Sequence, residues 1–180
     1  MNNWKLLKTE VLHKDFWNTV NKNTYELPNG KQIKDYIMLH NRPVAMIFAI
    51  TNEQKIVLIK EYKPGSGKVV TQLPAGYVDD KETPEEAAKR ELAEETGHTA
   101  KKFVKLGTLF SSSGKMTATV TCFMAEHAKK EQAQKLDEHE EVDVFTASLD
   151  EAQKMVETGI IDSGDSAAFI LMGINKLKSK

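Results

Sequence analysis

The stretch that decides the fold is Ala75–His98, which reads AGYVDDKETPEEAAKRELAEETGH. Thr83 is a suitable N-cap, Pro84 suits the first helical position, and Glu86, three residues after the cap, completes a capping box. Gly97 suits the position just beyond the last turn, where many helices end in a left-handed residue. The sequence therefore predicts a helix that starts at Pro84 and ends just before Gly97.

The predicted helix carries three carboxylates on one face near its end. Glu91 and Glu95 are four residues apart and Glu91 and Glu94 are three apart, so they share about one turn. Each such pair of like charges costs on the order of 0.2–0.5 kcal/mol, and the helix dipole disfavours acids in the last turn. A divalent cation between the carboxylates reverses that cost, and Mg²⁺ or Mn²⁺ prefers such oxygen ligands beside substrate phosphates. The alternative is a solvated acidic helix face.

The fixed residues of this stretch resemble the Nudix box, the signature of the Nudix hydrolases. They are Gly76, Glu82 and the run Arg90-Glu91-Leu92-x-Glu94-Glu95-x-Gly97, with the spacings of that signature. His98 departs from the family, which usually has an aliphatic residue there, and this affects packing behind the helix. Other segments are similar to the ADP-ribose and nucleoside diphosphate sugar pyrophosphatase branch: the N-terminal arm, residues 44–61, residues 72–76 and residues 159–162.

Turn residues and apolar alternation predict the rest of the fold. Strands are expected over residues 4–12, 25–39, 44–50, 56–61, 69–73, 100–110, 117–125 and 142–146. Residues 129–141 are polar and predict a mobile loop, and helices are expected over about residues 149–158 and 165–178. This order indicates an α+β (mixed α/β) domain. The resemblance implies the Nudix fold, a mixed β-sheet sandwiched between helices, as a single domain over residues 1–180.

Composition narrows the class of protein. The chain has 180 residues, 40% of them hydrophobic, which suits one domain with a full core. A net charge of −1 provides no basic field for nucleic acid. The single Cys122 excludes an intramolecular disulfide and fits a reducing compartment. The start of the chain is polar and the apolar runs are too short for a bilayer. We therefore expect a cytoplasmic protein without nucleic-acid or membrane partners.

The resemblance implies roles for the residues of the box. Glu91 and Glu95 are the expected ligands of Mg²⁺, with Mn²⁺ as a substitute, and Glu94 and the backbone carbonyl of Ala75 are further ligands. Glu94 can instead pair with Arg90, four residues before it on the same helix. Arg90 is expected either to hold these carboxylates or to contact substrate. Glu82, before the helix, is either a ligand or a loop carboxylate that accepts backbone hydrogen bonds.

The general base in this branch comes from a glutamate in a loop after the box. Residues 136–141, with the sequence LDEHEE, occupy that place. Glu140 is the expected base and Glu138 the alternative, because one can take the proton while the other binds a metal. A solvated loop carboxylate is the competing interpretation for either residue.

Substrate contacts are expected from two further residues. Lys63 falls where relatives often have an arginine that meets phosphate, and Trp17 in the arm can stack on a base or pack in an interface. Residues 111–117, SSSGKMT, lack the Ser-Pro-Gly and glutamate usual in ADP-ribose hydrolases. That departure favours a broader range of nucleoside diphosphate sugars.

The resemblance therefore implies Mg²⁺-dependent hydrolysis of the pyrophosphate bond of nucleoside diphosphate sugars, ADP-ribose among them, to a nucleoside monophosphate and a sugar phosphate. It also implies a homodimer in which residues 1–40 form an exchanged arm. One alternative is a Nudix hydrolase of nucleoside triphosphates or dinucleoside polyphosphates, against which the arm and residues 159–162 argue. Another is a non-catalytic nucleotide-sugar-binding module, which is expected to lack a box glutamate, whereas this chain lacks none.

Overall fold

The computed structural model describes residues 3–179, in which the chain forms two compact units. Among the described residues, unit 1 comprises residues 3–43 and 110–119, and unit 2 comprises residues 44–109 and 120–179. The expectation of a single domain over residues 1–180 with an arm at residues 1–40 stays a prediction. Within residues 3–179, no helix has the length and apolar character needed to cross a membrane.

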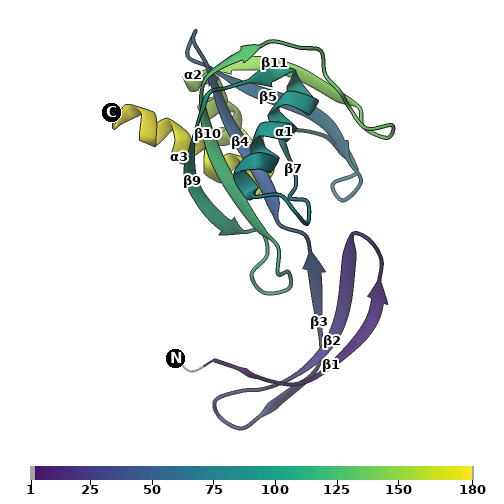
Figure 1. The fold of residues 1–180 in the computed structure, drawn as a ribbon. Coiled ribbons are helices and arrows are strands. Elements are labelled where there is room, and N and C mark those ends of the chain that lie inside the picture. The colour runs from purple at the N-terminus through teal and green to yellow at the C-terminus, as the bar shows by residue number, and fades with distance from the viewer. Residues whose placement is uncertain (1–2, 180) are drawn as a thin grey trace. The chain divides into compact units, whose positions relative to one another are not determined.

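Unit 1 contains an antiparallel three-stranded sheet in the order β1-β2-β3 (Figure 1). Its strands are β1 (Lys5–Lys14), β2 (Asn18–Glu26) and β3 (Gln32–Asn41). Most of β2 was not predicted, because NTVNKNT has no apolar alternation and gains its order from pairing with a strand on each side. The segment around Gly114, which departs from the ADP-ribose hydrolases, is tied to β3, since the Tyr36 hydroxyl donates to the Gly114 carbonyl at 2.5 Å.

Unit 2 is built on a mixed sheet whose central path runs β11-β5-β4-β10-β8. β4 pairs with β10 in parallel, whereas β5 pairs antiparallel with β4, β6 and β11. The strands are β4 (Val44–Thr51), β5 (Lys55–Lys63), β6 (Lys68–Gln72), β7 (Ala75–Tyr77), β8 (His98–Thr99), β9 (Lys102–Phe110), β10 (Thr119–Lys130) and β11 (Val142–Ser148).

Helices cover both faces of this sheet (Figure 1). Odd-numbered residues of β4, such as Ile47, pack with Leu92 of the helix α1 (Pro84–Thr96). Even-numbered residues such as Phe48 pack with Phe169 of α3 (Gly164–Lys178), and α2 (Leu149–Glu157) lies on the same side. The predicted fold class, a mixed sheet sandwiched between helices, is confirmed.

The helix α1 has the predicted limits. The Thr83 hydroxyl accepts a hydrogen bond from the Glu86 amide, and the Glu86 carboxylate accepts one from the Thr83 amide at 2.8 Å. Gly97 closes the helix in a left-handed conformation with φ of 70°. The predicted loop over residues 129–141 was wrong at its start, because Lys129 and Lys130 still pair with β8.

Candidate active site

The short strand β7, between β6 and α1, brings the backbone of Ala75 and Gly76 against the face of α1. Pairing with β4 fixes its position, since Ala75 lies opposite Met46 and Gly76 opposite Ala45. The Ala75 amide donates to the Glu95 carboxylate at 3.0 Å. A Cβ atom on Gly76 would lie only 2.0 Å from Glu91 Oε1. The Glu91 carboxylate therefore occupies space that any side chain at position 76 would fill.

Glu95 is a buried carboxylate, with 4% of its surface exposed. Burial raises the pKa of Glu95 well above its ordinary value, and the charge of Glu91 raises it further. The hydrogen bond from the Ala75 amide and the charge of Lys63 act in the opposite direction. A cation beside Glu95 would favour the ionised carboxylate and remove this electrostatic conflict.

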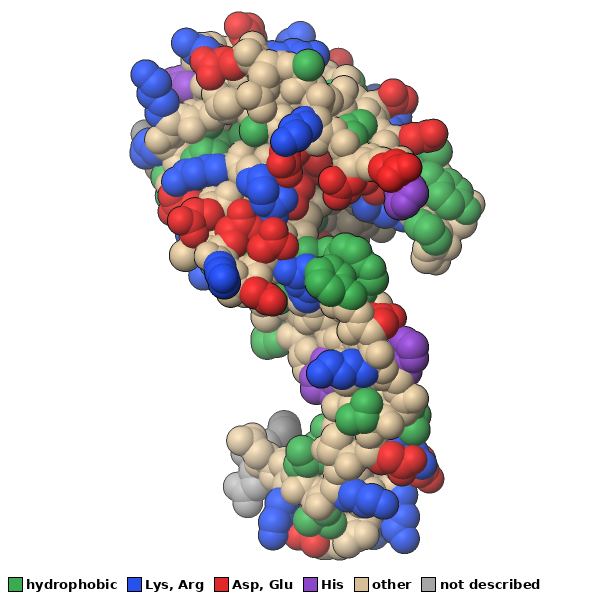
Figure 2. Space-filling model, turned by 45° about the vertical axis from the view of Figure 1, so that its right-hand side comes forward, with side chains coloured by type: hydrophobic (Ala, Val, Ile, Leu, Met, Phe, Trp, Pro, Cys, Tyr) green, Lys and Arg blue, Asp and Glu red, His purple; other side chains and the backbone are tan. Residues whose placement is uncertain are grey.

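Glu91 has a similar but less buried environment. Burial raises its pKa, the hydrogen bond and charge of Arg90 lower it, and the charges of Glu94 and Glu140 raise it. The predicted base Glu140 is therefore close enough for its charge to act on a predicted metal ligand. In the space-filling view, acidic side chains of unit 2 gather with Lys and Arg side chains among them (Figure 2).

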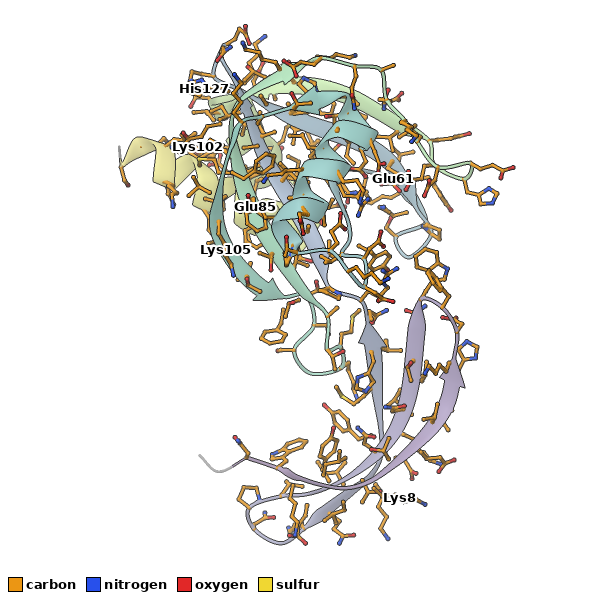
Figure 3. The ribbon with its side chains drawn as sticks, viewed as in Figure 1. Lys8, Glu61, Glu85, Lys102, Lys105 and His127 are labelled. Carbon is orange, nitrogen blue, oxygen red and sulfur yellow. The ribbon has the colours of Figure 1, made fainter. Side chains whose placement is uncertain are left out.

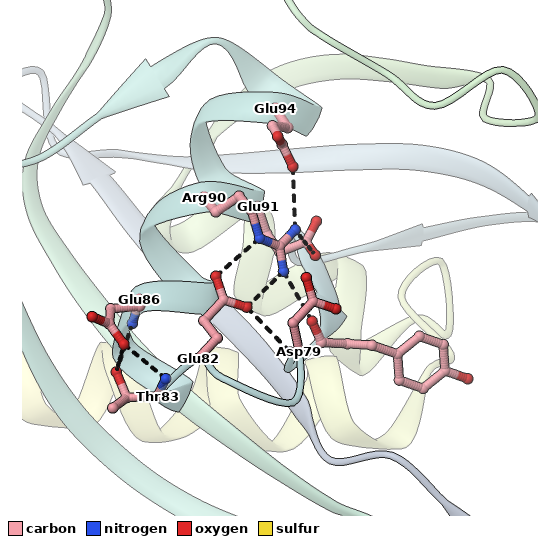
Figure 4. A network of polar contacts seen from close by, with 8 residues as sticks. Asp79, Glu82, Thr83, Glu86, Arg90, Glu91 and Glu94 are labelled. Atoms are coloured by element: carbon pink, nitrogen blue, oxygen red, sulfur yellow. Dashed lines mark hydrogen bonds and ion pairs between the residues drawn. The ribbon is translucent and has the colours of Figure 1, made fainter. Parts of the chain in front are cut away.

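Arg90 balances this acidic face (Figure 4). Its Nε and Nη2 atoms donate to the Glu82 carboxylate at 3.0 and 2.9 Å. Its Nη1 atom donates to Glu91 at 2.6 Å and to Glu94 at 3.2 Å. Nη2 also donates to the Tyr77 carbonyl at 3.0 Å. The bonds with Glu82 raise the pKa of Arg90 above its ordinary value. Arg90 thus ties the helix to the turn before it and keeps three carboxylates close together.

The network contains the alternative interactions that the sequence analysis gave for Glu94 and Glu82. Glu94 pairs with Arg90, and Glu82 accepts a bond from the Asp79 amide at 3.2 Å as well as those from Arg90. Metal ligation by Glu94 and substrate binding by Arg90 stay predictions. The guanidinium is engaged by carboxylates here, as expected for a residue that holds metal ligands in place.

The donor set fits a hard divalent cation, although no three acidic, histidine or cysteine side chains within residues 3–179 converge as a metal-binding group. Glu91, Glu95 and the carbonyl of Ala75 are all oxygen donors of the kind that Mg²⁺ and Mn²⁺ prefer. The buried Glu95 carboxylate and the space left by Gly76 are the structural features that support ligation.

The opposite wall of the site contains residues that the sequence did not single out. Glu61 on β5 accepts hydrogen bonds from Lys63 Nζ at 2.6 Å and from Gln72 Nε2 at 3.3 Å. The charges of Glu61 and Lys63 both act on Glu95. Two-residue alternation along β5, which places residues 57, 59, 61 and 63 on one face, was the signal that could have identified Glu61.

A cavity of about 420 Å³ lies beside this wall and includes the predicted base loop. Lys63 and Glu138 both line it. Glu140 caps a turn in the same loop, where its carboxylate accepts a bond from the Asp137 amide at 3.2 Å. Trp17 belongs to unit 1, where its ring meets Phe16 edge-on at 4.8 Å between centroids. The base and substrate-binding roles of these residues stay predictions.

The structure thus combines a mixed sheet between helices with carboxylates of one helix gathered against β7, and their oxygen atoms are donors of the kind that divalent cations prefer. Residues 40–163 match the family model described as NUDIX domain. The chain belongs to the Nudix family, as the resemblance implied. It is accordingly a hydrolase that acts on pyrophosphate bonds, and Nudix pyrophosphatases generally use divalent metals.

The chain is also similar to several named proteins. The chain is 40% identical over 134 residues to the ADP-ribose pyrophosphatase of Bacillus subtilis (strain 168), covering 74% of this chain and 72% of the relative. It is 38% identical over 161 residues to the methanol dehydrogenase activator of Bacillus methanolicus, covering 88% and 86%. It is 27% identical over 173 residues to the GDP-mannose pyrophosphatase of Enterobacter sp. (strain 638), covering 89% of each. A solved ADP compounds hydrolase shares the fold, with a TM-score of 0.85, 22% identity and coverage of 99% and 96%.

Proposed function

We propose that the protein hydrolyses the pyrophosphate bond of nucleoside diphosphate sugars, ADP-ribose among them, to a nucleoside monophosphate and a sugar phosphate, with Mg²⁺ as cofactor. Relatives named ADP-ribose, GDP-mannose and ADP-sugar pyrophosphatases support this substrate class. The observation that carries the proposal is the position of Glu91 and Glu95 against Ala75 and Gly76 of β7.

The proposed roles follow from the positions of the side chains. A bound divalent cation supplies charge neutralisation at the phosphate oxygens and lowers the pKa of the attacking water. Glu91, Glu95 and the Ala75 carbonyl hold the ion, and Glu94 is the further candidate ligand. Arg90 keeps these carboxylates together through its bonds to Glu91 and Glu94, and contact with the substrate is its alternative role.

Glu140 takes the proton of the attacking water in this proposal, and Glu138 is the alternative base. The charge of Glu140 acts on Glu91, which supports its place beside the reacting phosphate. Glu138 lines the same cavity as Lys63, whose ammonium meets a substrate phosphate. Trp17 stacks on the base of the nucleotide. A general base must reach the water within hydrogen-bond distance in the substrate complex.

The decisive experiment incubates the protein with ADP-ribose, GDP-mannose, a nucleoside triphosphate and a dinucleoside polyphosphate, each with and without Mg²⁺. Products are identified by mass in ¹⁸O-water, which also shows the phosphorus that is attacked. Cleavage of the nucleotide sugars is expected. Preferred cleavage of the triphosphate or dinucleoside substrate would support the alternative substrate class. Binding of ADP-ribose without any turnover would support the non-catalytic module.

Variants assign the roles. Glu95→Gln is expected to abolish most turnover through lost metal affinity. Glu140→Gln is expected to lower kcat by on the order of 10²–10⁴-fold with metal affinity nearly unchanged. Glu85→Gln is the matched control, because this glutamate lies on the first turn of the same helix and pairs with Lys89. If Glu140→Gln is as fast as wild type, Glu138 becomes the base.

We also propose a cytoplasmic homodimer assembled through residues 1–40, without nucleic-acid or membrane partners. Large apolar side chains are exposed along unit 1 (Figure 2), among them Trp4, Leu6, Val11, Leu12 and Phe16. Exposed apolar surface of this extent marks an interaction site. Light scattering should give twice the chain mass of 20.2 kDa, and Val11→Lys combined with Leu12→Lys should shift the protein towards monomer.

A further inference from the structure

Glu61 has no role in the proposed reaction, yet it lies inside the site. It is beside α1 on the sheet face that this helix covers (Figure 3). Its side chain is 15% exposed, and it accepts hydrogen bonds from Lys63 Nζ at 2.6 Å and Gln72 Nε2 at 3.3 Å. A largely buried carboxylate in a site already crowded with acids requires a reason beyond solubility.

The strand geometry explains how these three side chains meet. Residues 59, 61 and 63 of β5 share one face, and Ile59 lies opposite Gln72 of β6. The side chain of Gln72 therefore emerges on the same face, next to Glu61. Gln72 is only 7% exposed, so its amide position is set by packing and fixes the Glu61 carboxylate in turn.

Lys63 is the residue that depends on this arrangement. A lysine has a long flexible stem, and holding its ammonium at one place costs side-chain entropy that a bond to a partner must offset. The bond to Glu61 provides that partner, and Lys63 lines the cavity of about 420 Å³ that also contains Glu138. The bond to Glu61 thus holds the ammonium of Lys63, and its charge acts on the buried Glu95.

We propose that Glu61 is a positioning residue for Lys63: it holds the ammonium at the cavity, where Lys63 meets a substrate phosphate, and Gln72 holds Glu61 in turn. This inference rests on the role given to Lys63 in the proposed function. Two other roles for Glu61 make different predictions. If Glu61 only neutralises Lys63, its removal strengthens anion binding; if it is a metal ligand, its removal weakens metal binding.

The test combines Glu61→Gln, Lys63→Gln and the double variant in the full-length protein. Lys60→Gln is the matched control, because Lys60 lies next to Glu61 on β5 but on the other face, with its Nζ 5.4 Å from the Phe145 ring centre. Calorimetry measures the binding of inorganic pyrophosphate without metal, electron paramagnetic resonance measures the binding of Mn²⁺, and steady-state kinetics uses ADP-ribose. Thermal unfolding checks that each variant is folded.

Glu61→Gln and Lys63→Gln are each expected to weaken pyrophosphate binding about tenfold and to raise KM similarly, as loss of one charge-assisted contact does. The kcat should change little. The Mn²⁺ affinity should change by less than the pyrophosphate affinity, because Glu61 and Lys63 act on Glu95 only through their charges, and Lys60→Gln should match wild type. The double variant should be no weaker than Lys63→Gln alone, because Glu61 acts through Lys63. Gln72→Met, which leaves both charges in place, is expected to weaken pyrophosphate binding by a smaller factor and serves if Glu61→Gln does not fold.

Five outcomes overturn the inference. Tighter pyrophosphate binding by Glu61→Gln shows that Glu61 only neutralises Lys63, and lost Mn²⁺ binding shows that it is a metal ligand. Losses that multiply in the double variant show that Glu61 acts independently of Lys63. A weakened Lys63→Gln beside an unchanged Glu61→Gln rejects the positioning role but keeps the phosphate contact. An unchanged Lys63→Gln rejects the phosphate contact itself and removes the basis of the inference.

Discussion

Replacement of Gly76 by alanine tests whether the glycine in β7 is needed to leave room for the Glu91 carboxylate. The added Cβ would lie 2.0 Å from Oε1, 2.1 Å from Cδ and 2.6 Å from Oε2 of Glu91. Gly76 is not among the glycines with positive φ, so alanine strains no backbone dihedral there. The severe contacts of the added Cβ are therefore those with Glu91.

The size of the effect follows from the clash. Because Cβ atoms essentially never approach other heavy atoms within 3.0 Å, the contact at 2.0 Å forces the carboxylate to retreat by about 1 Å. Arg90 Nη1 holds that carboxylate at 2.6 Å, so the movement breaks or displaces this bond. A misplacement of about 1 Å at a reacting centre costs roughly 10²-fold in rate. That factor corresponds to about 2.7 kcal/mol of transition-state stabilisation.

The assay measures Mn²⁺ affinity and kcat/KM for ADP-ribose in Gly76→Ala. Both are expected to fall, with kcat/KM lower by about 10²-fold. Gly65→Ala is the control, because nothing lies within 4 Å of a Cβ at that position and its φ is not positive. Because the displaced atoms are the far end of the Glu91 side chain, Gly76→Ala is expected to change Mn²⁺ affinity more than stability. Wild-type Mn²⁺ affinity in Gly76→Ala would refute the reasoning.

Three other predictions concern stability and reactivity. Thr83→Ala removes the hydroxyl of the capping box and is expected to cost about 1 kcal/mol in urea unfolding; an unchanged midpoint would contradict this role. Burial raises the pKa of Cys122 to about 12, so Ellman's reagent at pH 8 should label the thiol only after unfolding, and rapid labelling of the native protein would be inconsistent with burial. The raised pKa of Glu95 means that the metal-free folded state holds a proton that the unfolded state has released, so stability should fall as pH rises above the ordinary carboxyl range through the folded pKa. Added Mg²⁺ should reverse that fall at neutral pH, and a stability that rises with pH without metal would contradict the assignment.

Local chemistry made α1 predictable from sequence. Its start is fixed by hydrogen bonds between Thr83 and Glu86, and its end by the left-handed Gly97, so all the information lies within one segment. Helical spacing likewise placed Glu91 and Glu95 on one face and allowed Glu94 to pair with Arg90. The bonds of Arg90 to Glu82 and to the Tyr77 carbonyl depend on the turn before the helix and could not be derived from spacing.

Features that depend on how strands pair could not be predicted from the sequence. β2 is polar and is ordered by its two neighbours, so apolar alternation carried no signal over residues 18–24. The alternation along β5 could be read from the sequence. The hydrogen bond between Glu61 and Gln72 could not, because it forms only when β6 pairs with β5. A one-residue change of register would move Gln72 to the other face, and only the folded sheet fixes that register.

The positions of the charged side chains explain how α1 tolerates acidic residues in its last turn. Acids in the last turn of α1 oppose the helix dipole, and the helix has no basic residue in that turn. The compensating cations come from elsewhere: Arg90 bonds Glu91 and Glu94 from within the helix, and Lys63 acts on Glu95 from the facing strand. Local and tertiary preferences conflict where function constrains the sequence. The conflict at Glu91 and Glu95 therefore points to the same place as the Nudix box, and it does so on physical grounds that are independent of any relative.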